Sequence, residues 1–114
     1  MTHQPFNWTQ NSTELFGQYW KIDGAKGIVA IVHGMGEHSS RYADFVVLKL
    51  NAAGYSVIAF DQFGHGLTKG KRGHCPNYEA VLDSVENLLK KSDEFLGADL
   101  PVFLYGHSMG GNVV

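Results

Sequence analysis

Three short, almost wholly apolar runs most constrain how this 114-residue chain can fold. They are Gly27–His33, Tyr55–Phe60 and Val102–Gly106. A strand that is exposed on one face alternates apolar and polar residues, whereas a strand buried on both faces is continuously apolar. The first two runs therefore predict strands that are buried on both faces, as in a parallel sheet, and the third run predicts a further strand.

The two segments between these runs change to helical spacing. In Tyr42–Ala53 the apolar residues recur every three or four positions, and Gly54 follows as a helix-ending residue. Asn77–Leu96 has the clearer helical pattern, closed by Gly97. Its apolar stripe consists of Tyr78, Val81, Leu82, Val85, Leu88, Leu89 and Phe95. Strands alternating with helices predict an α/β sheet with right-handed crossovers.

The residues that precede the first apolar run predict a different arrangement. Phe6–Gln10 and Glu14–Ile22 are rich in aromatic and extended-favouring residues, and the turn-forming residues Asn11–Thr13 separate them. We expect a β-hairpin here, followed by a turn at Asp23-Gly24. The predicted fold class is therefore α/β, with a mostly parallel sheet and an N-terminal antiparallel hairpin.

Composition excludes several classes of protein. Hydrophobic residues make up 44% of the chain and aromatic residues 12%, which is enough for a packed core. Nine Lys and Arg against eleven Asp and Glu give a formal charge of −2, which argues against a nucleic-acid partner. The single cysteine excludes an intrachain disulfide and a zinc site built from cysteines.

The sequence carries no targeting or membrane-spanning pattern. Residues 1–10 have neither a basic segment nor a continuous apolar one, so they do not resemble a signal peptide. The longest apolar run, Ile28–Val32, is far shorter than the ~20 residues that a membrane helix needs. We expect a cytoplasmic protein, although peripheral contact with a membrane surface leaves no pattern of this kind.

Reactive residues are expected after the predicted strands, because ligands of open α/β sheets bind beyond the carboxyl ends of the strands. The last such loop, Gly106–Gly111, matches G-x-S-x-G with Ser108 at its centre. In a nucleophile elbow a tight turn projects the serine Oγ outward, and the flanking glycines avoid a Cβ clash. The alternative is a glycine-rich turn that merely ends a strand.

The loop after the first strand, His33–His38, places Met35 between two glycines. An acyl-transfer enzyme needs a second backbone N–H for the oxyanion, and a glycine-flanked residue supplies one. The alternatives are a tight turn and a phosphate-binding loop. A Walker A motif is absent, and Ser39 stands where a G-x-G-x-x-G motif has its third glycine.

The middle loop, Asp61–Thr68, suggests structural roles. Asp61 has the chemistry of a general base, but we favour a carboxylate that shapes the loop by accepting backbone hydrogen bonds. His65 lies between two glycines, and we favour a structural role for it as well. None of the six histidines forms an H-x-x-x-H pair on a predicted helix, so we expect no metal.

Taken together, the three loops resemble the α/β-hydrolase superfamily, and specifically its monoacylglycerol lipase and lysophospholipase branch. The matching segments are HGMGEHSSRY (residues 33–42), DQFGHGLTKGKRGH (residues 61–74) and LPVFLYGHSMGG (residues 100–111). Their order and spacing also fit the family. Three motifs in one register are far more specific than any one of them.

The resemblance implies a set of site residues. Ser108 is the implied nucleophile, and the backbone N–H groups of Met35 and Met109 form the implied oxyanion hole. Glu37 and Arg41 correspond to family residues that receive a polar head group, with a surface ion pair as the alternative. No cofactor is implied, and the implied partner is a small lipid or ester substrate.

The resemblance also implies that the catalytic acid and base lie elsewhere. In this fold the triad runs Ser, acid, His along the chain, and only residues 112–114 follow Gly111. His107 adjoins Ser108, but neighbouring side chains diverge at an elbow. We therefore expect residues 1–114 to be the N-terminal part of one hydrolase domain, interrupted after the elbow. The alternative is an inactive interaction module with an apolar sheet edge at 102–105.

Overall fold

The computed structural model describes residues 1–34, 38–70 and 77–106. The strands are β1 (Thr2–Gln10), β2 (Thr13–Lys21), β3 (Gly27–Val32), β4 (Tyr55–Phe60) and β5 (Val102–Gly106). The helical elements are the 3₁₀ turn η1 (Ser39–Tyr42), the π-helical η2 (Ala43–Val47), α1 (Leu48–Ala52) and α2 (Tyr78–Leu96). The strands form one mixed sheet in the order β1-β2-β4-β3-β5. β4 and β5 pair with β3 in parallel, while β1 with β2 and β2 with β4 are antiparallel.

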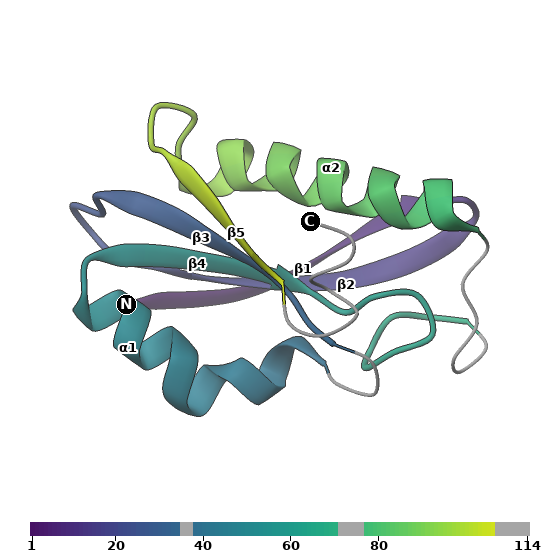
Figure 1. The fold of residues 1–114 in the computed structure, drawn as a ribbon, viewed down its shortest axis with the longest axis horizontal. Helices are drawn as coiled ribbons and strands as arrows, with labels where there is room; N and C mark the ends of the chain where they lie inside the picture. Colours follow the sequence, from purple (N-terminus) through teal and green to yellow (C-terminus); the bar gives the residue numbers. More distant parts are fainter. Residues whose placement is uncertain (35–37, 71–76, 107–114) are drawn as a thin grey trace.

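The helices cover both faces of the sheet, as the apolar runs predicted. Figure 1 shows α2 on one side and the continuous η1–η2–α1 segment on the other. Alternate residues of β3 and β4 face the two layers. The α2 layer buries Ile28, Ala30, Val32, Ile58, Phe60, Val85, Leu88 and Leu96. The opposite layer buries Trp20, Val29, Ile31, Tyr42, Val47, Val57 and Ala59.

The N-terminal hairpin is confirmed, with β1 longer at its start than the sequence suggested. Asn11 and Ser12 have φ values of 51° and 60°, which fits the twist of a two-residue hairpin turn. Gly17 faces Phe6 across the hairpin, and a Cβ at Gly17 would lie 2.5 Å from the Phe6 ring. The missing side chain at Gly17 therefore leaves room for the Phe6 ring.

The first predicted helix is not a single α-helix in the structure. Instead of one α-helix over Tyr42–Ala53, the chain forms a 3₁₀ turn, a π-helical segment and one short α-helix. The buried residues Tyr42 and Val47 are five positions apart, which is about 140° around an ideal α-helix. A wider π turn brings both side chains onto the sheet. Gly54 follows the helix with a φ of 100°, as a helix-ending glycine does.

The second predicted helix is confirmed as α2. The Asn77 side chain caps it by accepting a hydrogen bond from the Ala80 N–H at 2.7 Å, and Gly97 follows with a φ of 117°. Leu82 is 40% exposed, so it lies off the apolar stripe to which the spacing assigned it. Leu96, which was not assigned to the stripe, is buried instead.

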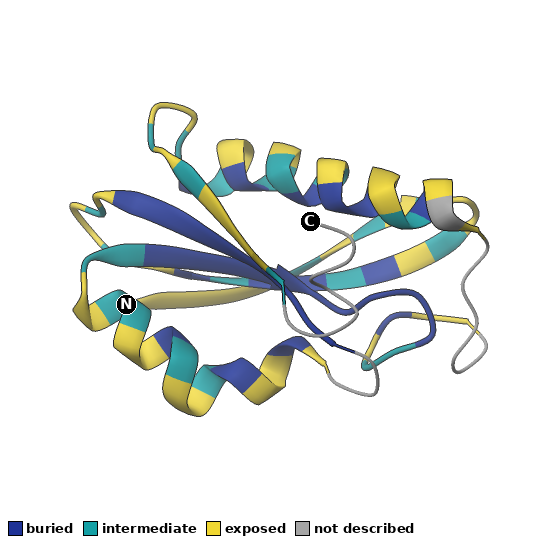
Figure 2. Cartoon of the chain, viewed as in Figure 1, coloured by how far each residue is buried: buried dark blue, intermediate teal, exposed yellow. Residues whose placement is uncertain are grey.

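The last predicted strand, β5, lies at the edge of the described sheet. Three of its side chains are exposed, namely Phe103, Leu104 and Tyr105. Figure 2 shows this strand mainly exposed next to the buried β3 and β4. Within the described residues β5 pairs only with β3, so its pattern is that of an apolar strand without a second neighbour.

A membrane-crossing helix is not found in the described part of the chain, where the longest helix, α2, carries charged residues throughout.

Candidate active site

The ends of three parallel strands lie in one row. Val32 at the end of β3 is paired in register with Phe60 of β4 and with Gly106 of β5. Neighbouring strands are about 4.8 Å apart. The three motif-bearing loops therefore start side by side at one edge of the sheet, which is where open α/β sheets bind ligands.

Most of the predicted site residues fall outside the described residues. Met35 and Glu37 lie within residues 35–37, and Ser108 and Met109 lie within residues 107–114. Their predicted roles therefore stay predictions. Arg41 is described, and it is an exposed residue of η1 whose backbone N–H donates to the His38 carbonyl at 3.2 Å.

Asp61, directly after β4, is a loop-shaping residue in this structure. Its Oδ1 accepts a hydrogen bond from the Ser39 N–H at 2.6 Å, and its Oδ2 accepts one from the Leu67 N–H at 2.8 Å. The residue is 2% exposed. A buried carboxylate needs such donors. The favoured interpretation of Asp61 is thus supported, because one carboxylate oxygen bonds the backbone at Ser39 and the other bonds the backbone of its own loop at Leu67.

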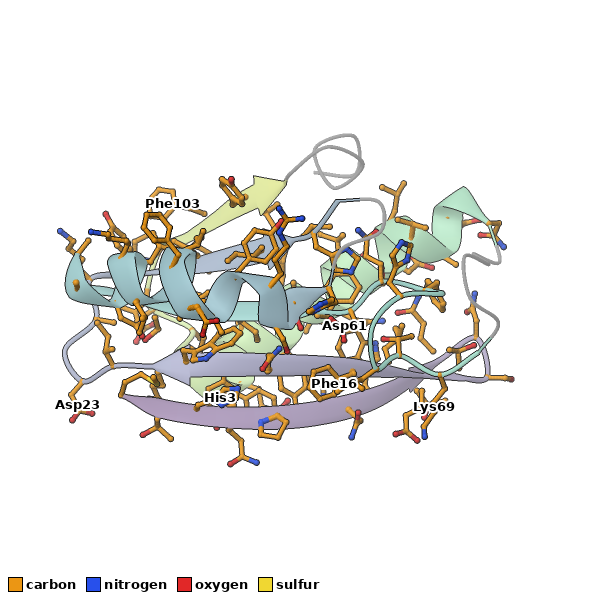
Figure 3. The ribbon with its side chains drawn as sticks, turned by 90° about the horizontal axis from the view of Figure 1, so that it is seen from below. His3, Phe16, Asp23, Asp61, Lys69 and Phe103 are labelled. Atoms are coloured by element: carbon orange, nitrogen blue, oxygen red, sulfur yellow. The ribbon has the colours of Figure 1, made fainter. Side chains whose placement is uncertain are left out.

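The loop that follows Asp61 is attached to β2. The Asp61 N–H donates to the Phe16 carbonyl at 2.8 Å, and the Phe16 N–H donates to Thr68 Oγ1 at 3.0 Å. The Lys69 N–H donates to the Glu14 carbonyl at 3.0 Å. Phe16, Asp61 and Lys69 are labelled in Figure 3. The middle loop is therefore bonded to the hairpin at both of its ends.

His33, at the start of the first loop, is fully buried and joins the first loop to the middle one. Its Nδ1 lies 2.8 Å from the Gly34 carbonyl, and its Nε2 accepts from the Gln62 N–H at 2.9 Å. A carbonyl only accepts and a backbone N–H only donates, so this pattern assigns the proton to Nδ1. The Gln62 side chain also donates to the His33 carbonyl.

His65 has the structural role that the sequence favoured. Its Nδ1 lies 2.9 Å from the Phe63 carbonyl, and its ring lies 5.1 Å from the His33 ring. Among the residues that the structure describes, no group of three or more His, Cys, Asp or Glu side chains is arranged to hold a metal ion.

Gln18, in β2, belongs to the site but carried no signal in the sequence. Its Nε2 donates to Ser39 Oγ at 2.6 Å and to Ser40 Oγ at 3.0 Å. Its Oε1 accepts from His3 Nε2 at 2.7 Å. A glutamine in a strand has no local pattern that marks it, and its partners are up to 22 residues away in the sequence. Only the folded arrangement reveals these contacts.

This arrangement holds the first loop at both ends. His33 is tied to Gln62 before the loop, and Ser39 is tied to Asp61 and Gln18 after it. Such anchoring can present a backbone N–H group in a fixed direction, which is what the stabilisation of a developing oxyanion requires.

Comparisons with known proteins agree with this geometry. Residues 23–114 match the family described as serine aminopeptidase, S33. The chain is 38% identical over 94 residues to the phospholipase YtpA of Bacillus subtilis, covering 82% of this chain and 35% of that protein. It is 38% identical over 101 residues to human monoglyceride lipase, covering 87% of this chain and 32% of the lipase.

A solved structure shares the fold. It is a thermostable carboxyl esterase from Bacillus coagulans in complex with glycerol, 35% identical with a TM-score of 0.89. The match covers 99% of this chain and 38% of the esterase. The chain thus spans about a third of the length of these relatives. Since the family match extends over most of its residues, the chain belongs to the serine aminopeptidase S33 family of α/β-hydrolases.

Proposed function

We propose that the protein is a serine ester hydrolase that cleaves monoacylglycerol or lysophospholipid-type carboxylic esters through an acyl-enzyme on Ser108. One observation carries the proposal. Gly106, the first residue of the G-x-S-x-G motif, is in register with Val32, after which the glycine-flanked Met35 follows. A nucleophile and an oxyanion donor must approach the same carbonyl, and adjacent strand ends suit that requirement.

The mechanism is acyl transfer in two steps. Ser108 Oγ attacks the substrate carbonyl as its proton passes to a histidine base, and the Met35 and Met109 N–H groups stabilise the oxyanion. The C–O bond to the alcohol then breaks, and that alcohol takes the proton. Water next attacks the ester on Ser108, and the fatty acid leaves as the serine regains its proton.

We further propose that residues 1–114 are the N-terminal part of one hydrolase domain. The matched segments make up only 35% and 32% of these two relatives, and in this fold the acid and the histidine follow the serine in sequence. The two groups are therefore proposed to lie after Ser108 in the parent protein.

The proposed substrate class rests on the relatives' names and on two polar residues. Similar proteins are named monoglyceride lipase and phospholipase. Glu37 and Arg41 follow the proposed oxyanion residue Met35 by two and six positions in the sequence, and Arg41 is exposed. A carboxylate and a guanidinium can bind the hydroxyl or phosphate groups of a glycerol-based head group.

The test uses the full-length parent protein and a fluorophosphonate probe. We expect the probe to label Ser108 and to fail with Ser108→Ala, which should also lose esterase activity by about 10³-fold or more. Arg41→Met should raise KM for monoacylglycerol more than KM for a short p-nitrophenyl ester, while Lys90→Met on α2 serves as a charge-matched control. Full esterase activity of Ser108→Ala would overturn the proposal, whereas a parent protein that takes no probe and cleaves no ester would favour an inactive interaction module.

A further inference from the structure

We propose that Gln18 is a positioning residue that holds the oxyanion loop in place from the N-terminal hairpin. The inference rests on the proposed function, since it gives β2 a part in presenting the Met35 N–H. It concerns a residue of the hairpin, which supplies none of the predicted site residues.

All hydrogen-bonding groups of the Gln18 side-chain amide have partners. The side chain is in β2 and 3% exposed. Its two N–H bonds point to the Ser39 and Ser40 hydroxyl oxygens at 2.6 and 3.0 Å. Its oxygen faces His3 Nε2 at 2.7 Å, which must then carry the proton. A buried amide with every group engaged is fixed in one orientation.

The Gln18 amide acts on Ser39, the residue that begins η1. Ser39 opens η1 and is fully buried, and its backbone N–H donates to Asp61 Oδ1. Its hydroxyl is held by Gln18 from the other side. Ser39 is thus fixed through both main chain and side chain, close in sequence to Met35. Figure 3 shows Asp61 near the start of the helical segment and His3 on the hairpin.

The other end of the loop, at His33, is also held by hydrogen bonds. The His33 ring and carbonyl are both bound by Gln62. The segment between His33 and Ser39 therefore starts and ends on residues that cannot shift without breaking buried hydrogen bonds. Losing Gln18 would remove the side-chain bond that holds Ser39, while the Ser39 N–H bond to Asp61 and the His33 end would stay in place. A displacement of about 1 Å at a reacting group can cost 10²-fold in rate.

A second glutamine of the same hairpin provides a matched comparison. Gln10 in β1 donates to the Ala80 carbonyl at 2.8 Å and accepts from Asn87 Nδ2 at 2.7 Å. These contacts join the hairpin to α2, on the sheet face opposite to η1. Gln10 and Gln18 therefore make similar bridges, but only Gln18 reaches the proposed oxyanion loop.

The experiment compares Gln18→Met with Gln10→Met in the full-length parent protein. For Gln18→Met we expect kcat to fall by about 10- to 100-fold, with KM changed by less than about twofold. Affinity for a trifluoromethyl ketone, whose adduct bears an oxyanion, should fall by the same factor as kcat. Gln10→Met should keep kcat and inhibitor affinity within about twofold. Urea unfolding of both variants corrects each rate for the folded fraction.

Ser39→Ala is the second variant in case Gln18→Met does not fold. It removes one hydroxyl and leaves the Ser39 N–H on Asp61, so we expect a smaller kcat loss of about three- to tenfold. In the double variant the two effects should not add, because both remove the same link. Unchanged kcat in folded Gln18→Met, or equal losses in Gln18→Met and Gln10→Met, would overturn the inference.

A measurement without catalysis separates this inference from the proposed function. Hydrogen exchange of the Ser39 and Ser40 amides should speed up at least tenfold in Gln18→Met and stay unchanged in Gln10→Met. If the parent protein cleaves no ester and Ser108 takes no probe, the proposed function fails while this exchange difference still reports on the anchor. If esters are cleaved but neither kcat nor exchange responds to Gln18→Met, only the anchor fails.

Discussion

Two strands flank β3 in parallel and have similarly apolar sequences, yet they differ in burial. β4 lies between β2 and β3, and its five residues from Ser56 to Phe60 are all buried. β5 has β3 on one side, and within the described residues nothing pairs with its other edge. Its Phe103, Leu104 and Tyr105 are 52%, 41% and 44% exposed. Apolar sequence alone therefore predicts a strand but does not decide how deeply it is buried.

The loop that follows β4 is held to neighbouring elements, as the strand itself is. After β4 the chain is tied back by Asp61 and by bonds to β2, so the loop shares the rigidity of the sheet. A strand with neighbours on both sides also fixes the residues that follow it. The residues at the two ends of the proposed oxyanion loop are hydrogen-bonded to this part of the molecule, through Asp61, Gln62 and Gln18.

The largest expected difference between β4 and β5 comes from removing an aromatic ring in each. Phe60 is fully buried against Trp8, so Phe60→Ala should lower the free energy of unfolding by about 3–5 kcal/mol. Phe103 is 52% exposed and contacts the Tyr55 ring edge-on, and Phe103→Ala should cost about 1 kcal/mol. Urea denaturation of the 114-residue chain measures both. Equal costs would show that β5 is as well packed as β4.

A second test acts on the loop after β4 and uses two glycines with positive φ. A Cβ on Gly66, with a φ of 53°, would lie 2.2 Å from Asp61 Oδ2. Gly24, with a φ of 67°, has no atom within 4 Å of its Cβ position. Gly24→Ala should therefore cost only the backbone strain of about 1–2 kcal/mol.

Gly66→Ala adds a steric clash with the Asp61 carboxylate, and we expect it to cost about 1–3 kcal/mol more than Gly24→Ala. The same variant should disturb the Ser39 N–H bond to Asp61. Thermal or urea unfolding of the two variants gives the difference directly. Equal losses would mean that Asp61 moves aside freely and that the loop after β4 is not held as tightly as its bonds suggest.

Periodicity and turn chemistry predicted most of the fold, because both are local properties of the sequence. The hairpin turn at Asn11, the buried strands and the Asn77–Leu96 helix were all identified in this way. The π-helical segment was not predicted, since it depends on how Tyr42 and Val47 fit the sheet. Leu82 was misassigned because one position of a regular stripe can still lie beyond the edge of the sheet.

The sequence predicted the motif-bearing loops of the candidate site but not the residues that support them. The loops carrying Met35 and Ser108 were recognisable because glycine spacing is written into the sequence. The structural role of Asp61 was also anticipated, since Asp commonly bonds nearby backbone. Gln18 and Gln62 carried no signal, because their partners are brought together only by the strand order. Residues that support a reactive loop are defined by long-range contacts, and spacing cannot reveal them.

A smaller effect is expected where α2 begins, on the connection between β4 and β5. Asn77 caps the helix through the Ala80 N–H, and Asn77→Ala should cost about 1 kcal/mol. Asn77→Asp should restore most of that loss, because an aspartate oxygen can accept the same bond and also favours the helix N-terminus. Circular dichroism during thermal unfolding measures both. No loss in Asn77→Ala would mean that α2 is held by its apolar face alone.

In the 114-residue chain, the smallest expected effect comes from a substitution on the edge strand β5. Leu104 is already 41% exposed, so Leu104→Lys in the 114-residue chain should change the free energy of unfolding by about 0.5 kcal/mol or less. In the full-length parent the proposed rest of the domain would cover this edge, and a buried lysine without a partner should then cost several kcal/mol. Urea unfolding of both forms gives the comparison. A small cost in both forms would mean that β5 stays an edge strand, against the proposal of a longer domain, whereas a large cost in the parent alone would place a second neighbour beside it.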